Sequence, residues 1–420
     1  MQKTKKIAQK NPLMTRTICA ALLAGLLNAC SSGSGDSENG DTDDSNEISV
    51  VQSSGKLLDS TPINVPSGLT AASSALLFDY DMDAVTGGKT TARAQLFEPA
   101  GQIPNNGYPL VVWAHGTTGI ANSCTPSLSF EEFSNATAIN SLLAAGYAVL
   151  APDYEGFGTP TIHPFYVRSS HANAVLAAIP AVHEIENTEL SAEWALVGHS
   201  QGGHVALATA RAEQDPEFPL QAVAALAPGT DLQPMSERAF EAVDQALAQG
   251  QLLNAGERVF FQNVVGAYIA QAIALVEPSF DPTVLFGDDV AGLLDQALNE
   301  ESCGDFALEI NEALSRHVIT GGTLANFGGL NRDWFTEPTV ANLLQQEELG
   351  DETQSAPLLV VHGDADRQIP ITASEAFVDR QRSLGTNVTF RAVSGARHGD
   401  VARSEFGITL DWLAQQFPVQ

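Results

Sequence analysis

Basic residues are scarce in this chain of 420 residues, which carries 20 Lys plus Arg against 50 Asp plus Glu and has a formal net charge of −30. Proteins that bind nucleic acid gain most of their affinity by neutralising phosphates with Lys and Arg, so the composition argues against that class of partner. It also disfavours docking on anionic lipid through a basic patch. Cysteines number only four and lack paired C-x-x-C spacing, which disfavours a structural zinc site. Apolar residues, at 44%, are abundant enough to build a large buried core.

The first 29 residues are typical of a secretory signal peptide rather than of a folded domain. Basic residues, with no acidic one among them, precede an apolar run over residues 18–27 that is too short to span a membrane. The run ends in the letters LNAC at residues 27–30, which resemble the lipobox of bacterial lipoproteins. That resemblance implies cleavage before Cys30, acylation of its thiol and, because Ser31 follows, sorting to the outer membrane.

Residues 30–47 form an acidic stretch rich in Ser and Gly, which reads CSSGSGDSENGDTDDSNE. Small and acidic side chains bury little apolar surface, so we expect a flexible tether rather than a part of the fold. Acyl chains on Cys30 would hold the protein to a membrane through burial of their methylene groups. The expected location is therefore extracytoplasmic, with the folded body attached to the membrane by an N-terminal lipid anchor.

The four cysteines divide into two pairs by their position. Cys19 leaves with the signal peptide and Cys30 carries the lipid, so Cys124 and Cys303 are left in an oxidising compartment. Two cysteines in such a compartment favour one disulfide between them over two buried free thiols. Closing a loop of this length would stabilise the fold by at most about 5 kcal/mol.

Short apolar runs alternate with helical patterns from residue 75 onward, which predicts an α/β fold with a mostly parallel central sheet flanked by helices. The predicted strands cover residues 76–80, 92–98, 109–114, 148–151, 194–198, 222–227, 357–362 and 387–393, and the predicted helices cover about 130–145, 171–186, 201–213, 372–384 and 402–416. Runs such as PLVVWA and PLLVVH are apolar throughout, as expected of strands that are covered on both faces.

The segment from residue 231 to 354 breaks this alternation. It contains helical patterns, for example over residues 290–299, and no good strand pattern. We therefore expect an α/β core made of residues 48–230 and 355–420, with a helical lid or cap inserted between the two parts. The apolar stretch 259–276 could pack on the core or line an apolar site, and packing is the simpler interpretation.

A G-x-S-x-G motif stands at residues 198–202, where the letters are GHSQG. An apolar strand pattern runs straight into the motif and a helical pattern leaves it, which is the strand–turn–helix context that presents a serine hydroxyl at the edge of a sheet. Glycines on both sides let neighbouring backbone pass close to a strained serine. Ser200 is therefore the candidate nucleophile, and the backbone N–H of Gln201 is a candidate oxyanion donor.

A serine nucleophile needs a general base and an acid that orients the base. In hydrolases with this strand–turn–helix serine, the acid and then the histidine follow later in the chain. Among the later histidines, His317 lies in the insertion and His362 ends a strand, whereas His398 lies in the loop between the last strand and the last helix and is favoured as the base. The acid follows the strand that ends in HGDADRQIP, where either Asp364 or Asp366 could reach the imidazole.

A third motif, HGTTG at residues 115–119, directly follows the predicted strand 109–114. It resembles the H-G loop that supplies the second oxyanion N–H in such hydrolases, and the amide of Thr117 is the candidate donor. Glycine in this loop lets the amides point into a site without obstruction by side chains.

Together these motifs resemble the α/β-hydrolase superfamily and, within it, the secretory lipase family, which comprises the fungal lipase A type and its bacterial relatives. The resemblance runs from about residue 76 to residue 417 and rests on HGTTG, the following Cys124, PDYEGFGTP, GHSQGG, APGTDL, HGDADRQIP and ARH in this order. It implies that the acid is Asp366, by its place in H-G-x-x-D, and that the histidine is His398. It also implies a helical lid at the position of the insertion.

These residues predict a serine ester hydrolase, a lipase or carboxylesterase that acts on neutral esters through an acyl-enzyme. Ser200 attacks, His398 transfers the proton, Asp366 orients the imidazole, and the amides of Gln201 and Thr117 hold the oxyanion. The chemistry requires no metal and no cofactor. Acyl transfer or peptide hydrolysis on the same triad is one alternative, and a non-catalytic surface lipoprotein that binds a ligand is another.

Overall fold

The computed structural model describes residues 55–119, 121–128, 130, 136–159, 163–212, 215–300, 302–354 and 356–419. The predicted signal peptide, Cys30 and the predicted tether lie outside these residues. The strands are β1 (Leu57–Pro62), β2 (Ala72–Asp83), β3 (Lys89–Pro99), β4 (Tyr108–Ala114), β5 (Ala148–Pro152), β6 (Leu190–His199), β7 (Leu220–Leu226), β8 (Leu358–Gly363) and β9 (Val388–Val393).

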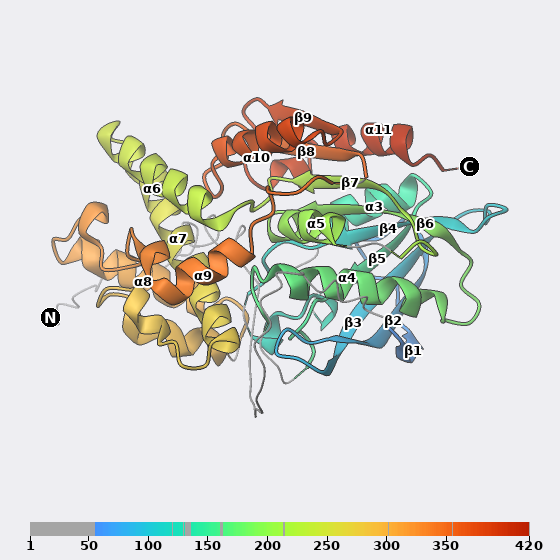
Figure 1. Ribbon diagram of the computed structural model, residues 1–420, viewed down its shortest axis with the longest axis horizontal. Helices are drawn as coiled ribbons and strands as arrows, with labels where there is room; N and C mark the ends of the chain where they lie inside the picture. The colour runs from blue at the N-terminus through green and yellow to red at the C-terminus, as the bar shows by residue number, and fades with distance from the viewer. Residues whose placement is uncertain are drawn as a thin grey trace, which may run out of the picture.

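These strands form one nine-stranded sheet in the order β1-β2-β3-β5-β4-β6-β7-β8-β9 (Figure 1). The pairs from β1 to β3, and the pair of β3 with β5, are antiparallel. All pairs from β5 through β4 to β9 are parallel. The expectation of an α/β fold with a mostly parallel sheet is therefore confirmed.

The edge strand β1 is the strand that the sequence pattern does not predict. Its letters LLDSTP contain an Asp and end in Pro, and most of its residues are exposed. It pairs with β2 alone, at the edge of the sheet. A strand with one neighbour and little buried surface carries no strong apolar pattern, and Pro and Asp are common at such edges.

Helices cover both faces of the sheet. One face carries α4 (Arg168–His183), α5 (Gln201–Arg211) and α10 (Ile371–Leu384), and the other carries α3 (Ala136–Ala144) and α11 (Gly407–Gln416). In β4, Val112 belongs to the apolar core of the first face and Val111 to that of the second. Successive side chains of a strand point to opposite faces, so a strand buried on both sides is apolar at every position.

The segment between β7 and β8 includes residues 231–354, which the sequence predicts to be a lid or cap and which we call the cap insertion. Its helices are α6 (Leu232–Ala248), α7 (Leu252–Val276), α8 (Asp305–Ile319) and α9 (Pro338–Gln346), which lie together at one end of the molecule (Figure 1). Among the described residues of the cap insertion, the one β pairing is an isolated bridge between Phe286 and Leu330. The helical pattern over residues 290–299 folds as a 3₁₀ helix, Ala291–Leu298, rather than as an α-helix. This short segment has a glycine in its first turn, and a short helix with glycine gains little from i→i+4 bonding.

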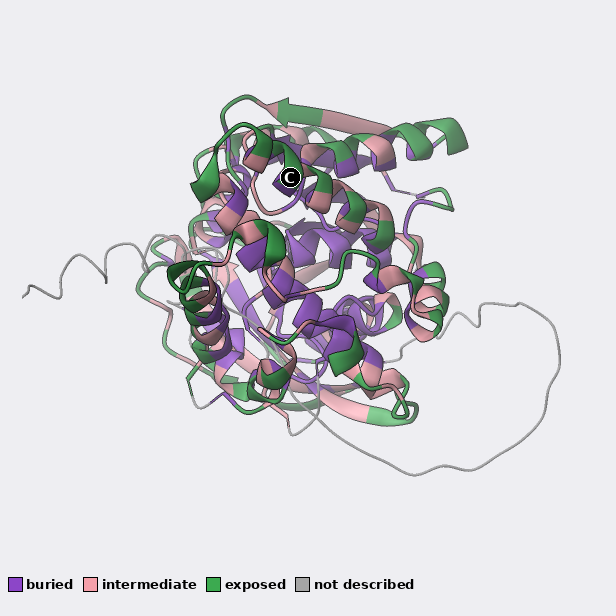
Figure 2. Cartoon of the chain, turned by 90° about the vertical axis from the view of Figure 1, so that its left-hand side faces the viewer, coloured by how far each residue is buried: buried purple, intermediate pink, exposed green. Residues whose placement is uncertain are grey.

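The long helix α7 forms the centre of the cap insertion. Within the part of the chain that the structure describes, it is the one helix long and apolar enough to cross a membrane, and 83% of its most apolar window is buried inside the protein. Val264 and Tyr268 belong to the same apolar core as the first face of the sheet. Figure 2, viewed from the cap side, shows buried segments inside the molecule and exposed turns around its edge. Packing, rather than lining a site, thus accounts for most of the stretch 259–276.

Candidate active site

Ser200 occupies the sharp turn between β6 and α5, with φ 59° and ψ −116°. A positive φ is uncommon for a residue that carries a Cβ, so the surrounding structure must hold it in place. The flanking glycines leave no room for a side chain. A Cβ on Gly198 would lie 1.9 Å from the carbonyl oxygen of Gly202, and a Cβ on Gly202 would lie 1.9 Å from the carbonyl oxygen of Ala114. Close backbone packing therefore fixes the serine at the carboxyl edge of the sheet.

Three side chains that are far apart in the sequence form one line of hydrogen bonds. Nε2 of His398 lies 2.8 Å from Oγ of Ser200, and its Nδ1 lies 2.7 Å from Oδ2 of Asp366. His398 comes from the loop after β9 and Asp366 from the turn after β8. All three residues are buried. With the serine hydroxyl donating to Nε2 and Nδ1–H donating to the carboxylate, this arrangement can remove the serine proton.

The turn after β8 carries two aspartates, and the structure places only one of them against the histidine. Asp364 is exposed, and its Oδ1 accepts a backbone N–H of the loop after β9 at 2.6 Å. Oδ1 of Asp366 accepts the backbone N–H groups of Gln368 at 2.7 Å and Ile369 at 3.0 Å. These two bonds hold the Asp366 carboxylate so that Oδ2 faces His398.

A second ring shares the Asp366 carboxylate. Nε2 of His362 lies 3.1 Å from Oδ2 of Asp366, and its Nδ1 lies 2.8 Å from Oγ of Ser374. Burial raises the pKa of Asp366, but the two neighbouring histidines outweigh it and hold that pKa well below its usual range. The carboxylate is therefore ionised at neutral pH. Sequence reasoning considered His362 only as a base and missed this contact, which its spacing of four residues from Asp366 could have suggested.

The H-G loop after β4 packs against the serine turn. A Cβ on Gly116 would meet the carbonyl oxygen of His199 at 3.3 Å and Cβ of Ser200 at 3.5 Å, so the loop backbone runs directly beside Ser200. Thr117 follows in this loop and is half-buried, and Gln201 is the first residue of α5. The first N–H groups of a helix have no partner within the helix. The two predicted oxyanion donors thus belong to the two backbone segments that adjoin Ser200.

Two further histidines near Ser200 bond to backbone rather than to the side chains of Ser200, His398 and Asp366. Nε2 of His199 lies 2.8 Å from the carbonyl oxygen of His398, and Nδ1 of His115 lies 2.8 Å from the carbonyl oxygen of Gly116. Burial lowers the pKa of His199 to about 3 and that of His115 to about 4, so both rings are neutral. They hold the loops around the site.

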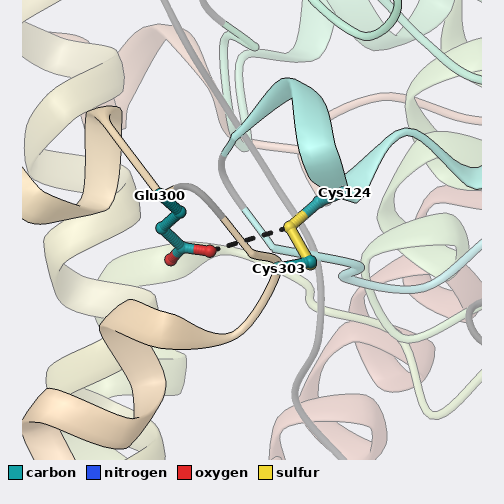
Figure 3. Close-up of side chains that lie close together, drawn as sticks. All are labelled: Cys124, Glu300 and Cys303. Carbon is teal, nitrogen blue, oxygen red and sulfur yellow. Dashed lines mark hydrogen bonds between the residues drawn. A yellow bond between two sulfur atoms is a disulfide. The ribbon is translucent and has the colours of Figure 1, made fainter.

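The predicted disulfide joins Cys124, which follows the H-G loop, to Cys303, which precedes α8 (Figure 3). The carboxylate of Glu300 accepts the backbone N–H groups of Gly304 at 2.9 Å and Phe306 at 3.2 Å, and one of its oxygens lies 3.8 Å from Sγ of Cys124. Among the described residues, the two cysteines and this glutamate are the one group with the spacing of metal ligands. Because the sulfurs are bonded to each other, the group offers no pair of thiolates. It links the cap insertion to the loop beside the nucleophile.

A narrow pocket with about 40 Å³ of free volume lies beside the triad. Its walls are mostly apolar and come from α6, α7, residues 330 and 334, and the turn after β8. Met235, Ala239, Phe261, Val265 and Ile369 are among the apolar lining residues, and Ser236, Gln262 and Gln368 are polar ones. The ring centroid of Phe261 lies 6.5 Å from that of His398, which places the pocket next to the hydrogen-bonded side chains. The pocket suits an apolar chain better than a charged group.

The sheet, the serine turn and the hydrogen-bonded Ser200, His398 and Asp366 define the chain as an α/β-hydrolase. Among solved structures, it is similar to LipA, a rice cell wall degrading esterase from Xanthomonas oryzae, with a TM-score of 0.67 and 20% identity over 86% of this chain and 98% of that one. It is also similar to Candida antarctica lipase A in its closed state, with a TM-score of 0.63 and 17% identity over 86% of this chain and 81% of that one.

The model of the secretory lipase family matches residues 127–420, and the chain belongs to this family. The matched region includes the serine turn, the cap insertion and both loops that carry the acid and the histidine. A comparison with curated protein sequences gives no match. The resemblance expected from the motifs is therefore confirmed at the level of family and fold.

Proposed function

We propose that this protein is a secreted serine ester hydrolase of the lipase or carboxylesterase type. The observation that carries the proposal is the line of hydrogen bonds from Asp366 through His398 to Ser200. Membership of the secretory lipase family supports the same class of activity. The roles of the individual residues follow from their geometry.

In the proposed reaction, Oγ of Ser200 attacks the ester carbonyl carbon while Nε2 of His398 accepts the hydroxyl proton. The ionised carboxylate of Asp366 stabilises the imidazolium that forms. His398 then donates the proton to the leaving alcohol, which leaves the acyl group on Ser200, and water releases the acid by the same proton transfers. The backbone N–H groups of Gln201 and Thr117 stabilise the negative charge on the carbonyl oxygen in both steps.

The proposed substrate is a neutral ester with an apolar acyl or alcohol part. The pocket beside Phe261 is lined mostly by apolar residues, so it favours hydrocarbon. The formal net charge of −30 disfavours the approach of anionic substrates. The cap insertion supplies most of the pocket wall, and we propose that it acts as the lid of the enzyme.

We also propose that the mature protein begins at Cys30 and is held to the outer membrane by lipid on that residue. The support for this location is the apolar run and the LNAC letters in the sequence, together with membership of a secretory family. Labelling cells with a radioactive fatty acid tests it. We expect label on the wild type and none on Cys30→Ser, and label that persists on the variant would rule out this anchor.

The enzymatic proposal is tested with a series of esters of rising acyl-chain length, assayed with the wild type and with Ser200→Ala. We expect hydrolysis by the wild type and a loss of about 1,000-fold or more in the variant, because no other group replaces the nucleophile. Ser383→Ala, at an exposed serine that bonds only the backbone of α10, is the matched control. Activity that survives in Ser200→Ala would refute the mechanism. A maximum at acetate or butyrate esters would favour an esterase over a lipase, and transfer of the acyl group to added alcohol in preference to water would favour a transferase.

A further inference from the structure

Behind the serine turn, the side chain of Gln201 ends between two buried histidines. Its Nε2 lies 2.7 Å from Nε2 of His163 and 3.3 Å from Nε2 of His171, and all three residues are fully buried. The proposed mechanism uses the backbone N–H of Gln201 as an oxyanion donor and gives its side chain no role. Because this side chain and the N–H donor belong to the same residue, the contacts of the side chain affect the direction of the N–H.

The hydrogen bonds around His163 allow one assignment of its proton. Nδ1 lies 2.8 Å from the carbonyl oxygen of Glu155, which can only accept, so Nδ1 carries the proton. Nε2 of the neutral ring then has a free lone pair and accepts from the side-chain amide of Gln201. A protonated ring would set two donors against each other. Burial lowers the pKa of His163 to about 3, so the accepting form persists at neutral pH.

Aromatic packing holds the His163 ring in place. The ring stacks on Phe157 with 4.7 Å between centroids, and it also stacks on Tyr154 at 5.9 Å and on His171 at 5.5 Å. A ring packed on several sides in a dense interior cannot turn without displacing its neighbours. The chain of bonds from Glu155 through His163 to Gln201 therefore anchors the Gln201 side chain to a rigid part of the core.

We propose that His163 is a positioning residue for the reaction: by holding the side chain of Gln201, it fixes the direction of the Gln201 backbone N–H that receives the oxyanion. This inference rests on the proposed function. Ser200, with φ 59°, precedes Gln201, the first residue of α5. The carbonyl oxygen of the peptide group between them accepts the backbone N–H groups of His204 at 3.2 Å and Gly229 at 3.3 Å, and the anchored side chain of Gln201 adds a restraint on the N–H side of the same group. Oxyanion stabilisation depends steeply on the direction of the donor N–H, and a small change in that direction lowers the rate.

The test compares His163→Phe with His163→Gln in the full-length protein. His163→Phe removes the acceptor, and we expect kcat to fall by about 10- to 100-fold with KM changed less than about 2-fold, because the donor acts in the transition state. His163→Gln restores an acceptor near the position of Nε2 and should recover most of the loss. The affinity for a trifluoromethyl ketone, which forms an oxyanion on Ser200, should fall by the same factor as kcat.

Two matched variants separate positioning from general damage to the fold. His183→Phe makes the same change at the C-terminal end of α4, where the ring bonds only the backbone of Ile179 and Ser191, and it should leave kcat unchanged.

The double variant Gln201→Leu with His163→Phe should have a kcat no lower than that of the slower single variant, since both substitutions remove the same contact. Full additivity of the two losses, or a kcat of His163→Phe equal to that of the wild type, would overturn the inference. Urea denaturation of each variant, followed by circular dichroism, shows whether a loss of kcat reflects misfolded protein. If Ser200→Ala stays active, the proposed function itself fails, whereas an inactive Ser200→Ala with a fully active His163→Phe refutes the positioning role alone.

Discussion

The α/β core and the cap insertion both contribute to the site, but each is packed internally in a different way. In the core, β4 is buried at every residue, and the glycines around Ser200 pass within contact distance of neighbouring backbone. In the cap insertion, α6 buries only Leu232, Met235, Ala239, Val243 and Ala246, spaced three or four residues apart. The core therefore sets the positions of the reacting atoms through backbone packing, while the cap insertion shapes an apolar volume through side chains that tolerate more change.

Both ends of the cap insertion are tied to the core at one aspartate. Oδ1 of Asp231, just before α6, accepts the backbone N–H groups of Leu349 at 2.8 Å and Gly350 at 3.2 Å. Its other oxygen pairs with Arg380 on α10. The first and last parts of the insertion are thus held close together by a single buried carboxylate.

The first turns of α7 also contact the turn that carries the acid. Nη2 of Arg258 donates to the carbonyl oxygen of Asp366 at 3.2 Å, and Glu257 pairs with Arg367 at 2.8 Å. The second pair is partly exposed and contributes little stability by itself. These polar contacts and the disulfide therefore couple the cap insertion to the site, in addition to the apolar packing of α7 on the core.

The largest difference in kcat is expected within the core, between substitutions of two aspartates in the same turn. Asp366→Asn removes the charge that stabilises the His398 imidazolium, so kcat should fall about 1,000-fold or more. Asp364→Asn is the matched control, and its kcat should change less than about 3-fold because its side chain bonds only a backbone N–H. Steady-state kinetics on one ester measures both. Equal losses in the two variants would show that the acid assignment is wrong.

The second largest difference is expected for the free energy of unfolding when a glycine of each region is replaced by alanine. In Gly202→Ala the new Cβ meets the carbonyl oxygen of Ala114, so the free energy of unfolding should fall by about 3 kcal/mol or more. In Gly256→Ala, on α7, the nearest atom is 3.9 Å away, and the higher helix propensity of Ala should add about 0.5–1 kcal/mol. Urea denaturation followed by circular dichroism checks both. Comparable destabilisation of the two variants would contradict the contrast between core and cap insertion.

Removing the covalent link tests how far the cap insertion depends on it. Replacing Cys124 and Cys303 together by Ser opens a loop of 179 residues, and the free energy of unfolding should fall by about 2–4 kcal/mol. We expect kcat to fall as well, since Cys124 follows the H-G loop that carries Thr117. Wild type treated with a reductant should behave like the double variant. A variant with unchanged stability would mean that packing alone holds the cap insertion in place.

The smallest expected effect concerns the carboxyl group beside that disulfide and its dependence on pH. Burial raises the pKa of Glu300 to about 7, above its value in the unfolded chain. A group with a raised folded pKa stabilises the fold at low pH, and this contribution is lost as the pH rises towards 7. Glu300→Gln cannot ionise, so from pH 5 to pH 8 its stability relative to wild type should rise by about 1–2 kcal/mol. Urea denaturation at both pH values measures the change, and a constant difference would show that Glu300 does not titrate in this range.

Local motifs made much of the site predictable. The serine turn and the order of serine, acid and histidine could be recognised because each needs a particular backbone path within a few residues. Asp364 and Asp366 could not be separated by spacing, because the decision depends on which carboxylate accepts the N–H groups of Gln368 and Ile369. The resemblance to the family pointed to Asp366, and the structure places that residue against His398.

Contacts between distant residues were not predictable in the same way. His163 contacts Gln201, which lies 38 positions away in the sequence, and a single histidine is no recognisable motif for such a contact. The strand β1 has too little buried surface to leave a pattern, and the 3₁₀ helix Ala291–Leu298 shares the apolar spacing of an α-helix. For His163 and β1, contact with another part of the chain decided the outcome, whereas Ala291–Leu298 differs from an α-helix because it is short and has a glycine in its first turn.

The amino-acid sequence by itself determined the family, the α/β order of elements and the residues that carry the motifs, because glycine spacing, apolar strands and helix starts are local requirements of the backbone. Only the tertiary structure decided which carboxylate faces His398, which histidines contact Asp366 and Gln201, and where the cap insertion lines an apolar pocket. Those features depend on distances between side chains from different elements. Such distances follow from dense packing of the whole chain, which no local pattern encodes.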